Sequence, residues 1–147
     1  MNYEQEKRMH MSFCGSYCHK CDWHTGKIRK TFRSALDMLE DYKFTRLLEG
    51  KSDRENLRLG LSLLSDSGIC SGCKAEIARG PEQDRCKIRQ CSSEKGSQLC
   101  SECEVFPCHL LKNNAGVTKW GCIENLEEIK KIGFERWIDK QWRSVRE

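Results

Sequence analysis

The chain has 147 residues, of which 33% are charged and 37% belong to a hydrophobic set that already includes its 11 cysteines. The net charge of +4 is mildly basic, so it permits a nucleic-acid partner without arguing for one. The N-terminus lacks the apolar run of a secretory signal, and no segment approaches the roughly 18 apolar residues of a membrane span. We therefore expect a soluble, cytoplasmic protein without a membrane partner.

Two segments in the first half of the chain carry the apolar periodicity of amphipathic helices. The first predicts a helix over residues 28–48 that stops at Gly50. Ser52 and Glu55 have the spacing of a capping box and predict a second helix over residues 53–65. The periodic residues are Ile28, Phe32, Ala35, Leu36, Leu39, Tyr42, Leu57, Leu61 and Leu64.

The C-terminal segment predicts two more helical stretches. Asn125 and Glu128 form a second possible capping box within an apolar stripe that runs to Gly133. A last helix then places Phe134, Trp137, Ile138 and Trp142 on one face. We interpret these aromatic residues as core contacts rather than as a stacking surface for bases.

Residues 70–108 lack periodicity and are rich in Gly, Ser and Cys, which is typical of loops. Large apolar residues are scarce there, so something other than a hydrophobic core must hold the segment. The predicted fold is a small α-helical, cysteine-rich, metal-stabilised protein with three or four helices, a loop-rich metal-binding lobe at 70–108 and little or no strand. We expect residues 1–147 to form a single domain.

The cysteines fall into groups whose spacing favours metal binding. Thiols stay reduced in the cytoplasm, and an odd number of cysteines leaves one unpaired in any disulfide scheme. Two residues between cysteines let both sulfurs reach one ion from a tight turn, and Ser71-Gly72 suits such a turn. We predict as metal ligands Cys14, Cys18, Cys21, Cys70, Cys73, Cys86, Cys91, Cys100, Cys103 and Cys108. The eleventh, Cys122, is expected to be a buried structural thiol.

Spacing alone leaves the grouping of these ligands open. One site could join Cys70, Cys73, Cys86 and Cys91, or the pairs Cys70-Cys73 and Cys100-Cys103 could meet. The remaining thiols would then complete one or two further sites.

The triplet Cys14-Cys18-Cys21 needs a fourth ligand from Cys100, Cys103, Cys108 or a histidine. His19, His24 and His109 lie near cysteines, and we expect them to be solvated or hydrogen-bonded otherwise. The triplet has the spacing of the cluster motif of radical S-adenosylmethionine enzymes, but a typical barrel of about 250 residues does not fit in this chain.

Two kinds of metal centre suit the thiols. Zinc, with two or more ions, would form closed sites that support a binding or adaptor module, for which another protein is a candidate partner. The alternative is an iron-sulfur redox or electron-transfer protein, and a second alternative is an enzyme with an open zinc-thiolate centre. No set of side chains indicates a catalytic nucleophile, which favours a non-enzymatic role. Nucleic-acid binding has weak support. We interpret the basic cluster on the first predicted helix as a solvated helix face; it contains Lys27, Arg29, Lys30 and Arg33.

Five motifs in order resemble the family known as domain of unknown function 3795. They are C-G-S-Y-C-H-K-C, C-S-G-C, C-K-I-R-Q-C-S-S-E-K-G, C-S-E-C-E-V-F-P-C-H-L-L and N-L-E-E-I-K-K-I-G-F-E-R-W. The resemblance implies a small bacterial or archaeal metal-binding protein, with zinc suspected and no established activity. Similar proteins often have a cysteine where this chain has Gln83, and a cysteine pair after the last helix where this chain ends W-R-S-V-R-E. Any site that uses those thiols would be altered or absent here.

Overall fold

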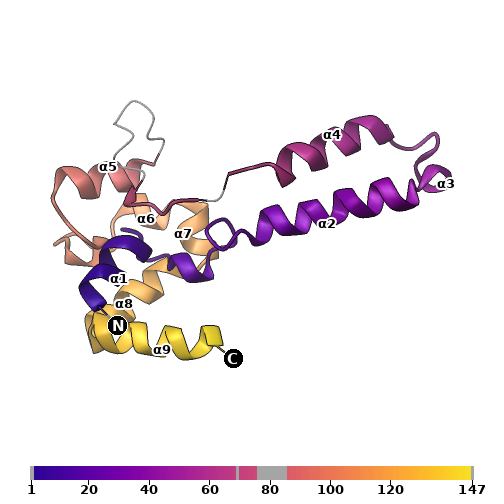
Figure 1. Cartoon of the computed structure of the whole chain (residues 1–147). Helices are drawn as coiled ribbons and strands as arrows, with labels where there is room; N and C mark the ends of the chain where they lie inside the picture. The colour runs from indigo at the N-terminus through magenta and orange to yellow at the C-terminus, as the bar shows by residue number, and fades with distance from the viewer. Residues whose placement is uncertain (1, 69, 76–85, 147) are drawn as a thin grey trace. The chain divides into compact units, whose positions relative to one another are not determined.

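The computed structural model describes residues 2–68, 70–75 and 86–146. The chain divides into two compact units (Figure 1). We call Met1–Cys21 together with Ser71–Glu147 the core unit, and Asp22–Cys70 the hairpin unit. The single domain expected from the sequence stays a prediction, because compact units of one chain can fold together or apart. In the described part of the chain, no helix is both long enough and apolar enough to cross a membrane.

The core unit is built from short helices joined by tight turns. They are α1 (Tyr3–His10), η1 (Cys18–Lys20), α5 (Lys87–Glu94), η4 (Cys100–Glu102), α6 (His109–Lys112), α7 (Ala115–Lys119), α8 (Cys122–Ile132) and α9 (Phe134–Arg146). Among the described residues, β-type pairing is limited to one isolated antiparallel bridge between Met11 and Tyr17. The predicted class, an α-helical cysteine-rich fold without strands, is therefore confirmed for the described ranges.

The apolar core of this unit gathers around α8 and α9, which pack on each other. Leu126 and Ile138 are fully buried, and Trp137 lies beside them with 1% of its surface exposed. Phe134 and Trp142 pack against the same cluster. This confirms the prediction that the aromatic face of the last helix makes core contacts. Cys122 is likewise buried, as expected.

The hairpin unit contains α2 (Lys27–Tyr42), α3 (Thr45–Leu48) and α4 (Arg54–Ser65). Figure 1 shows α2 and α4 running antiparallel along each other. The helix predicted over residues 28–48 is interrupted, because Lys43 and Phe44 both adopt positive φ angles (57° and 47°) that end α2 before α3 begins.

Several large apolar side chains of this unit are exposed. They include Met38, Tyr42, Leu47 and Leu63.

Both predicted capping boxes were wrong. The N-cap of α4 is Asp53, whose carboxylate accepts from the Asn56 N–H at 2.8 Å, so the chain does not use Ser52. Helix α8 begins at Cys122 after the left-handed Gly121, and Asn125 therefore lies inside the helix rather than at its cap.

The described structure also has more helices than the three or four expected, and α5 lies within the stretch predicted as loop. The part of that loop prediction that covers residues 76–85 lies outside the described residues.

Candidate metal centre

Four of the predicted ligands line one cavity of about 170 Å³ in the core unit. Cys91 comes from the second turn of α5, Cys100 and Cys103 bracket η4, and Cys108 is the N-cap of α6. The C-x2-C pair forms a tight turn in which the Cys103 N–H donates to the Cys100 carbonyl at 3.2 Å. Three separate elements thus bring four thiols to a common space that Phe106 and Leu111 help to line.

This grouping differs from both arrangements considered from spacing. Cys86 is the N-cap of α5, and Cys91 lies five residues further along the helix. Five helical residues advance about 7.5 Å and rotate the side chain by about 140°. Cys86 instead lines a separate depression with His109 and Asn113. The helix that the sequence did not predict is therefore what separates Cys86 from Cys91.

Polar groups around the cavity act on its thiols. Val105 donates its N–H to the Cys103 sulfur, which lowers the pKa of that thiol, and Lys95 Nζ donates to the same sulfur at 3.4 Å. Burial raises the pKa of Cys100 to about 11, although the Ser92 hydroxyl lies 3.3 Å from its sulfur and has the opposite effect. Negative charge on Cys14, Cys108 or Cys91 would also raise the pKa of Cys100, so a bound cation would favour the ionised form of these thiols.

The sulfurs are spaced more widely than in a closed zinc-thiolate site. Zn–S bonds of about 2.3 Å in a tetrahedron place the sulfurs about 3.8 Å apart. Within the described residues of the core unit, no three thiols have sulfurs all within 4.8 Å of one another. The donor set suits a thiophilic metal, but a single zinc ion would require the loops around η4 to contract.

A second group of thiols surrounds Cys14. Its sulfur lies 3.2 Å from the Ser12 hydroxyl and shares a hydrogen bond with Cys122. The hydrogen bond from Cys122 lowers the pKa of Cys14 to about 6 against the opposing effect of burial. The same contact, together with burial, raises the pKa of Cys122. Cys14 is therefore the thiol of this pair whose pKa is lowered. Cysteine spacing gives no sign of this contact, because no other cysteine is close to Cys122 in sequence.

Cys18 and Cys73 both lie near the partly buried ammonium of Lys74. Burial lowers the pKa of Lys74 to about 8, while the two thiolates act in the opposite direction. Gly72 has a φ of +103°, and a side chain there would come within 3.1 Å of the Met9 carbonyl. The glycine of this C-x2-C turn is therefore required by a close approach of two backbone segments.

The last two predicted ligands are Cys21 and Cys70, each of which is the last residue of a sequence segment assigned to one unit. Cys21 ends η1, where its N–H donates to the Cys18 carbonyl at 3.0 Å. Cys70 belongs to the hairpin unit, where its carbonyl oxygen lies 2.8 Å from Nδ1 of His24. The backbone of Cys70 also donates to the Trp23 carbonyl at 3.4 Å. His24 is thus hydrogen-bonded, as we expected.

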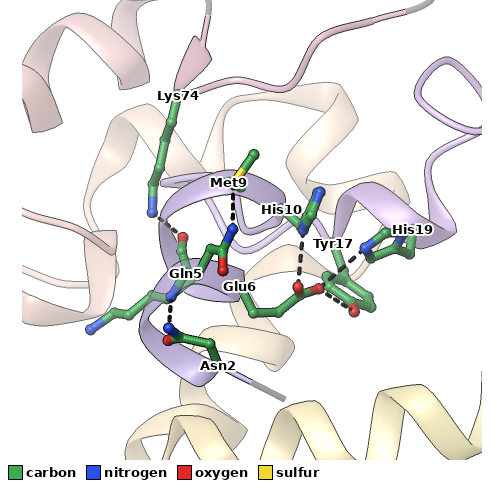
Figure 2. A network of polar contacts seen from close by, with 9 residues as sticks. Asn2, Gln5, Glu6, Met9, His10, Tyr17, His19 and Lys74 are labelled. Carbon is green, nitrogen blue, oxygen red and sulfur yellow. Dashed lines mark hydrogen bonds and ion pairs between the residues drawn. The ribbon is translucent and has the colours of Figure 1, made fainter.

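A polar cluster centred on Glu6, shown in Figure 2, was not predicted from the sequence. One carboxylate oxygen, Oε2, lies 3.0 Å from His10 Nδ1, and the other, Oε1, lies 3.2 Å from His19 Nε2 and accepts from the Tyr17 hydroxyl at 2.8 Å. Burial by itself would raise the pKa of the Glu6 carboxyl, but hydrogen bonds with Tyr17 and His10 outweigh it and hold that pKa below its usual value. Burial and the carboxylate together raise the pKa of Tyr17.

A sequence signal for part of this cluster was present. Glu6 and His10 are four residues apart, which places them on one face of α1. His19 reaches Glu6 because the Met11–Tyr17 bridge closes the turn before it. No local sequence pattern predicts that bridge.

These features define a small helical protein whose many cysteines converge from separate elements. A family model described as "Protein of unknown function (DUF3795)" matches residues 10–113. The chain belongs to this family, which confirms the resemblance seen in its motifs. No curated protein and no solved structure matches the chain.

Proposed function

We propose that the protein binds zinc through the thiolates of Cys91, Cys100, Cys103 and Cys108. The observation that carries the proposal is the convergence of these four side chains, from three elements, on one cavity. A structural zinc contributes roughly 10 to 16 kcal/mol of apparent binding free energy in small peptides. That is comparable to the whole stability of a typical domain, about 5 to 15 kcal/mol. Zinc would therefore decide whether the segment around η4 keeps its fold.

The remaining predicted ligands are candidates for a second thiolate centre. Cys14, Cys18 and Cys73 belong to the core unit, where electrostatic contacts link them through Cys122 and Lys74. Cys21, Cys70 and Cys86 stay in the proposed ligand set without a partner assigned. We propose the reducing cytoplasm as the compartment, because thiols there are available to metals.

We propose a structural role for the zinc and a binding or adaptor role for the protein. A closed four-sulfur site leaves no position for substrate. The exposed apolar side chains of the hairpin unit are consistent with a binding role, because large exposed apolar residues mark interaction surfaces when they gather.

An iron-sulfur cluster in the same cavity is the second candidate. The observation in its favour is the wide spacing of the sulfurs. In the described part of the core unit, no three of them lie within 4.8 Å of one another. A cluster has several irons with inorganic sulfide between them, so its cysteine ligands stand further apart than those of one zinc ion. A cluster would need less contraction of the loops around η4 than zinc.

Anaerobic purification with metal analysis and an absorption spectrum separates the two candidates. The zinc proposal predicts bound zinc and no visible absorption band. A brown protein that contains iron and labile sulfide would contradict zinc and support the iron-sulfur cluster. The Cys103→Ser variant should lose one metal equivalent. Ser97→Ala, which changes a cavity-lining residue without a thiol, should keep it. Equal metal content in both variants would contradict a centre in this cavity.

A further inference from the structure

We propose that Glu6, His10 and His19 form a separate site for a divalent transition ion, with nitrogen and oxygen ligands in place of thiolates. The three side chains offer one ligand atom each, and these atoms all lie within 4.8 Å of one another. The site goes beyond the zinc-thiolate function proposed above and does not depend on it, because the two sites share no residue.

The contact distances fit one small ion. With ligand bonds of about 2.0 to 2.2 Å, neighbouring ligand atoms of a tetrahedral zinc site stand about 3.3 Å apart. The Glu6 oxygens lie 3.0 Å from His10 Nδ1 and 3.2 Å from His19 Nε2. These contacts use different oxygens of Glu6, Oε2 and Oε1, as Figure 2 shows. An ion held by all three side chains would therefore draw ligand atoms that lie within 4.8 Å of one another together by up to about 1.5 Å.

Two elements hold the ligands in place. Glu6 and His10 project from one face of α1 at positions i and i+4, and His19 comes from η1. The turn that carries His19 is fixed by the Met11–Tyr17 bridge, with the Ser12 N–H donating to the Ser16 carbonyl at 2.9 Å. The cluster is therefore part of the folded core unit.

The surroundings resemble the outer shell of a metal site. The Tyr17 hydroxyl donates to Glu6 Oε1 at 2.8 Å and fixes the orientation of the carboxylate. The Tyr17 ring meets Trp137 edge-on at 5.8 Å, and the His19 ring lies 5.2 Å from that of Trp142. These aromatic rings make an apolar wall that would limit water access and strengthen the attraction between carboxylate and cation.

The exposure of the side chains leaves a path for the ion. The Glu6 side chain is 10% exposed, whereas those of His10 and His19 are 25% and 29% exposed. A buried carboxylate with two imidazoles at the rim gives three protein ligands and an open position toward solvent. Two histidines with one carboxylate suit zinc or ferrous iron, whereas the thiol cavity would select thiophilic centres.

The rival explanation is a metal-free network in which the imidazoles donate directly to Glu6. Both explanations predict that the cluster stabilises the fold, so stability measurements cannot separate them. A metal-specific response of the two imidazoles can.

The experiment is a zinc titration of the full chain under a non-chelating reductant, followed by NMR of the histidine ring nitrogens. We expect Nδ1 of His10 and Nε2 of His19 to shift strongly, because each would coordinate the ion directly. Unchanged His10 and His19 signals under saturating zinc would overturn the proposal. This readout needs no variant and so does not depend on how a mutant folds.

Variants provide the second arm. A His10→Gln variant should bind this equivalent of zinc more than about 100-fold more weakly, since loss of even an outer-shell partner costs 10- to 100-fold. Glu4→Gln, an exposed carboxylate on the same helix, is the matched control and should bind normally. Cys103→Ser should leave the histidine response intact even if the thiolate centre is lost. Equal zinc stoichiometry in the His10→Gln variant and the wild type would refute the site.

Discussion

Replacing Gly15 by alanine tests how tightly the first cysteine motif is packed against α8. Gly15 has a φ of +101°, where an alanine is strained by about 1 to 3 kcal/mol. A Cβ there would also collide with the Cys122 carbonyl oxygen and lie 2.8 Å from Leu126 Cγ. The carbonyl belongs to a helix and cannot rotate away, so overpacking adds about 1 to 3 kcal/mol. We therefore expect Gly15→Ala to cost about 2 to 6 kcal/mol.

Gly96→Ala is the matched control for this prediction. Gly96 also has a positive φ, +66°, but a Cβ there would meet nothing within 4 Å. Its cost should be limited to the left-handed backbone, about 1 to 2 kcal/mol. Urea unfolding of both variants in the same metal-loaded state, followed by near-ultraviolet circular dichroism, measures the difference. If Gly15→Ala is no more destabilising than Gly96→Ala, the close packing of this motif against α8 is wrong.

Three further substitutions test the core, a helix cap and a loop anchor. Leu126→Ala, at a fully buried position, should cost about 2 to 5 kcal/mol, whereas Leu63→Ala, at 67% exposure, should stay within about 0.5 kcal/mol in thermal unfolding. Asp53→Ala should remove about 0.5 to 2 kcal/mol from α4, and Ser52→Ala should be close to neutral; helical signal during urea unfolding decides which residue is the cap. Asn125→Ala removes the donor that reaches the Gly15 carbonyl at 2.9 Å and should cost about 0.5 to 1.5 kcal/mol, measured by urea unfolding; an unchanged midpoint would contradict that anchor.

The longer helices could be predicted from the sequence because each turns an apolar stripe toward a neighbour. Helices α2, α4 and α9 have 12 or more residues, enough for the stripe to repeat. Helices α6 and α7 have four and five residues, too few for any periodicity. Helix α5 has eight residues with Ile88 as its buried apolar anchor, so its composition resembles the loops around it.

The candidate thiolate site could be predicted in residue type but not in grouping. Spacing marks C-x2-C pairs because a turn of that length points both sulfurs the same way. It does not show that a helix separates Cys86 from Cys91 or that Cys122 lies beside Cys14. The Glu6 cluster was missed for a similar reason, because its third member depends on a turn closed between Met11 and Tyr17.

The motif C-G-S-Y-C-H-K-C serves two chemically different neighbourhoods of the core unit. Cys14 contacts Cys122 and interacts with Cys100, whereas Tyr17 and His19 contact Glu6. A backbone hydrogen bond also joins the motif to the thiol cavity. The Cys100 N–H donates to the carbonyl of Phe13, the residue just before the motif, at 2.8 Å. A substitution within the motif would therefore disturb both neighbourhoods, and its effect on metal content could not be assigned to either. The variants that separate the two proposed sites have to lie outside the motif, at Cys103 for the thiolates and at His10 for the imidazoles. If each of those variants lost the same equivalent of metal, a single coupled centre would replace the two sites proposed here.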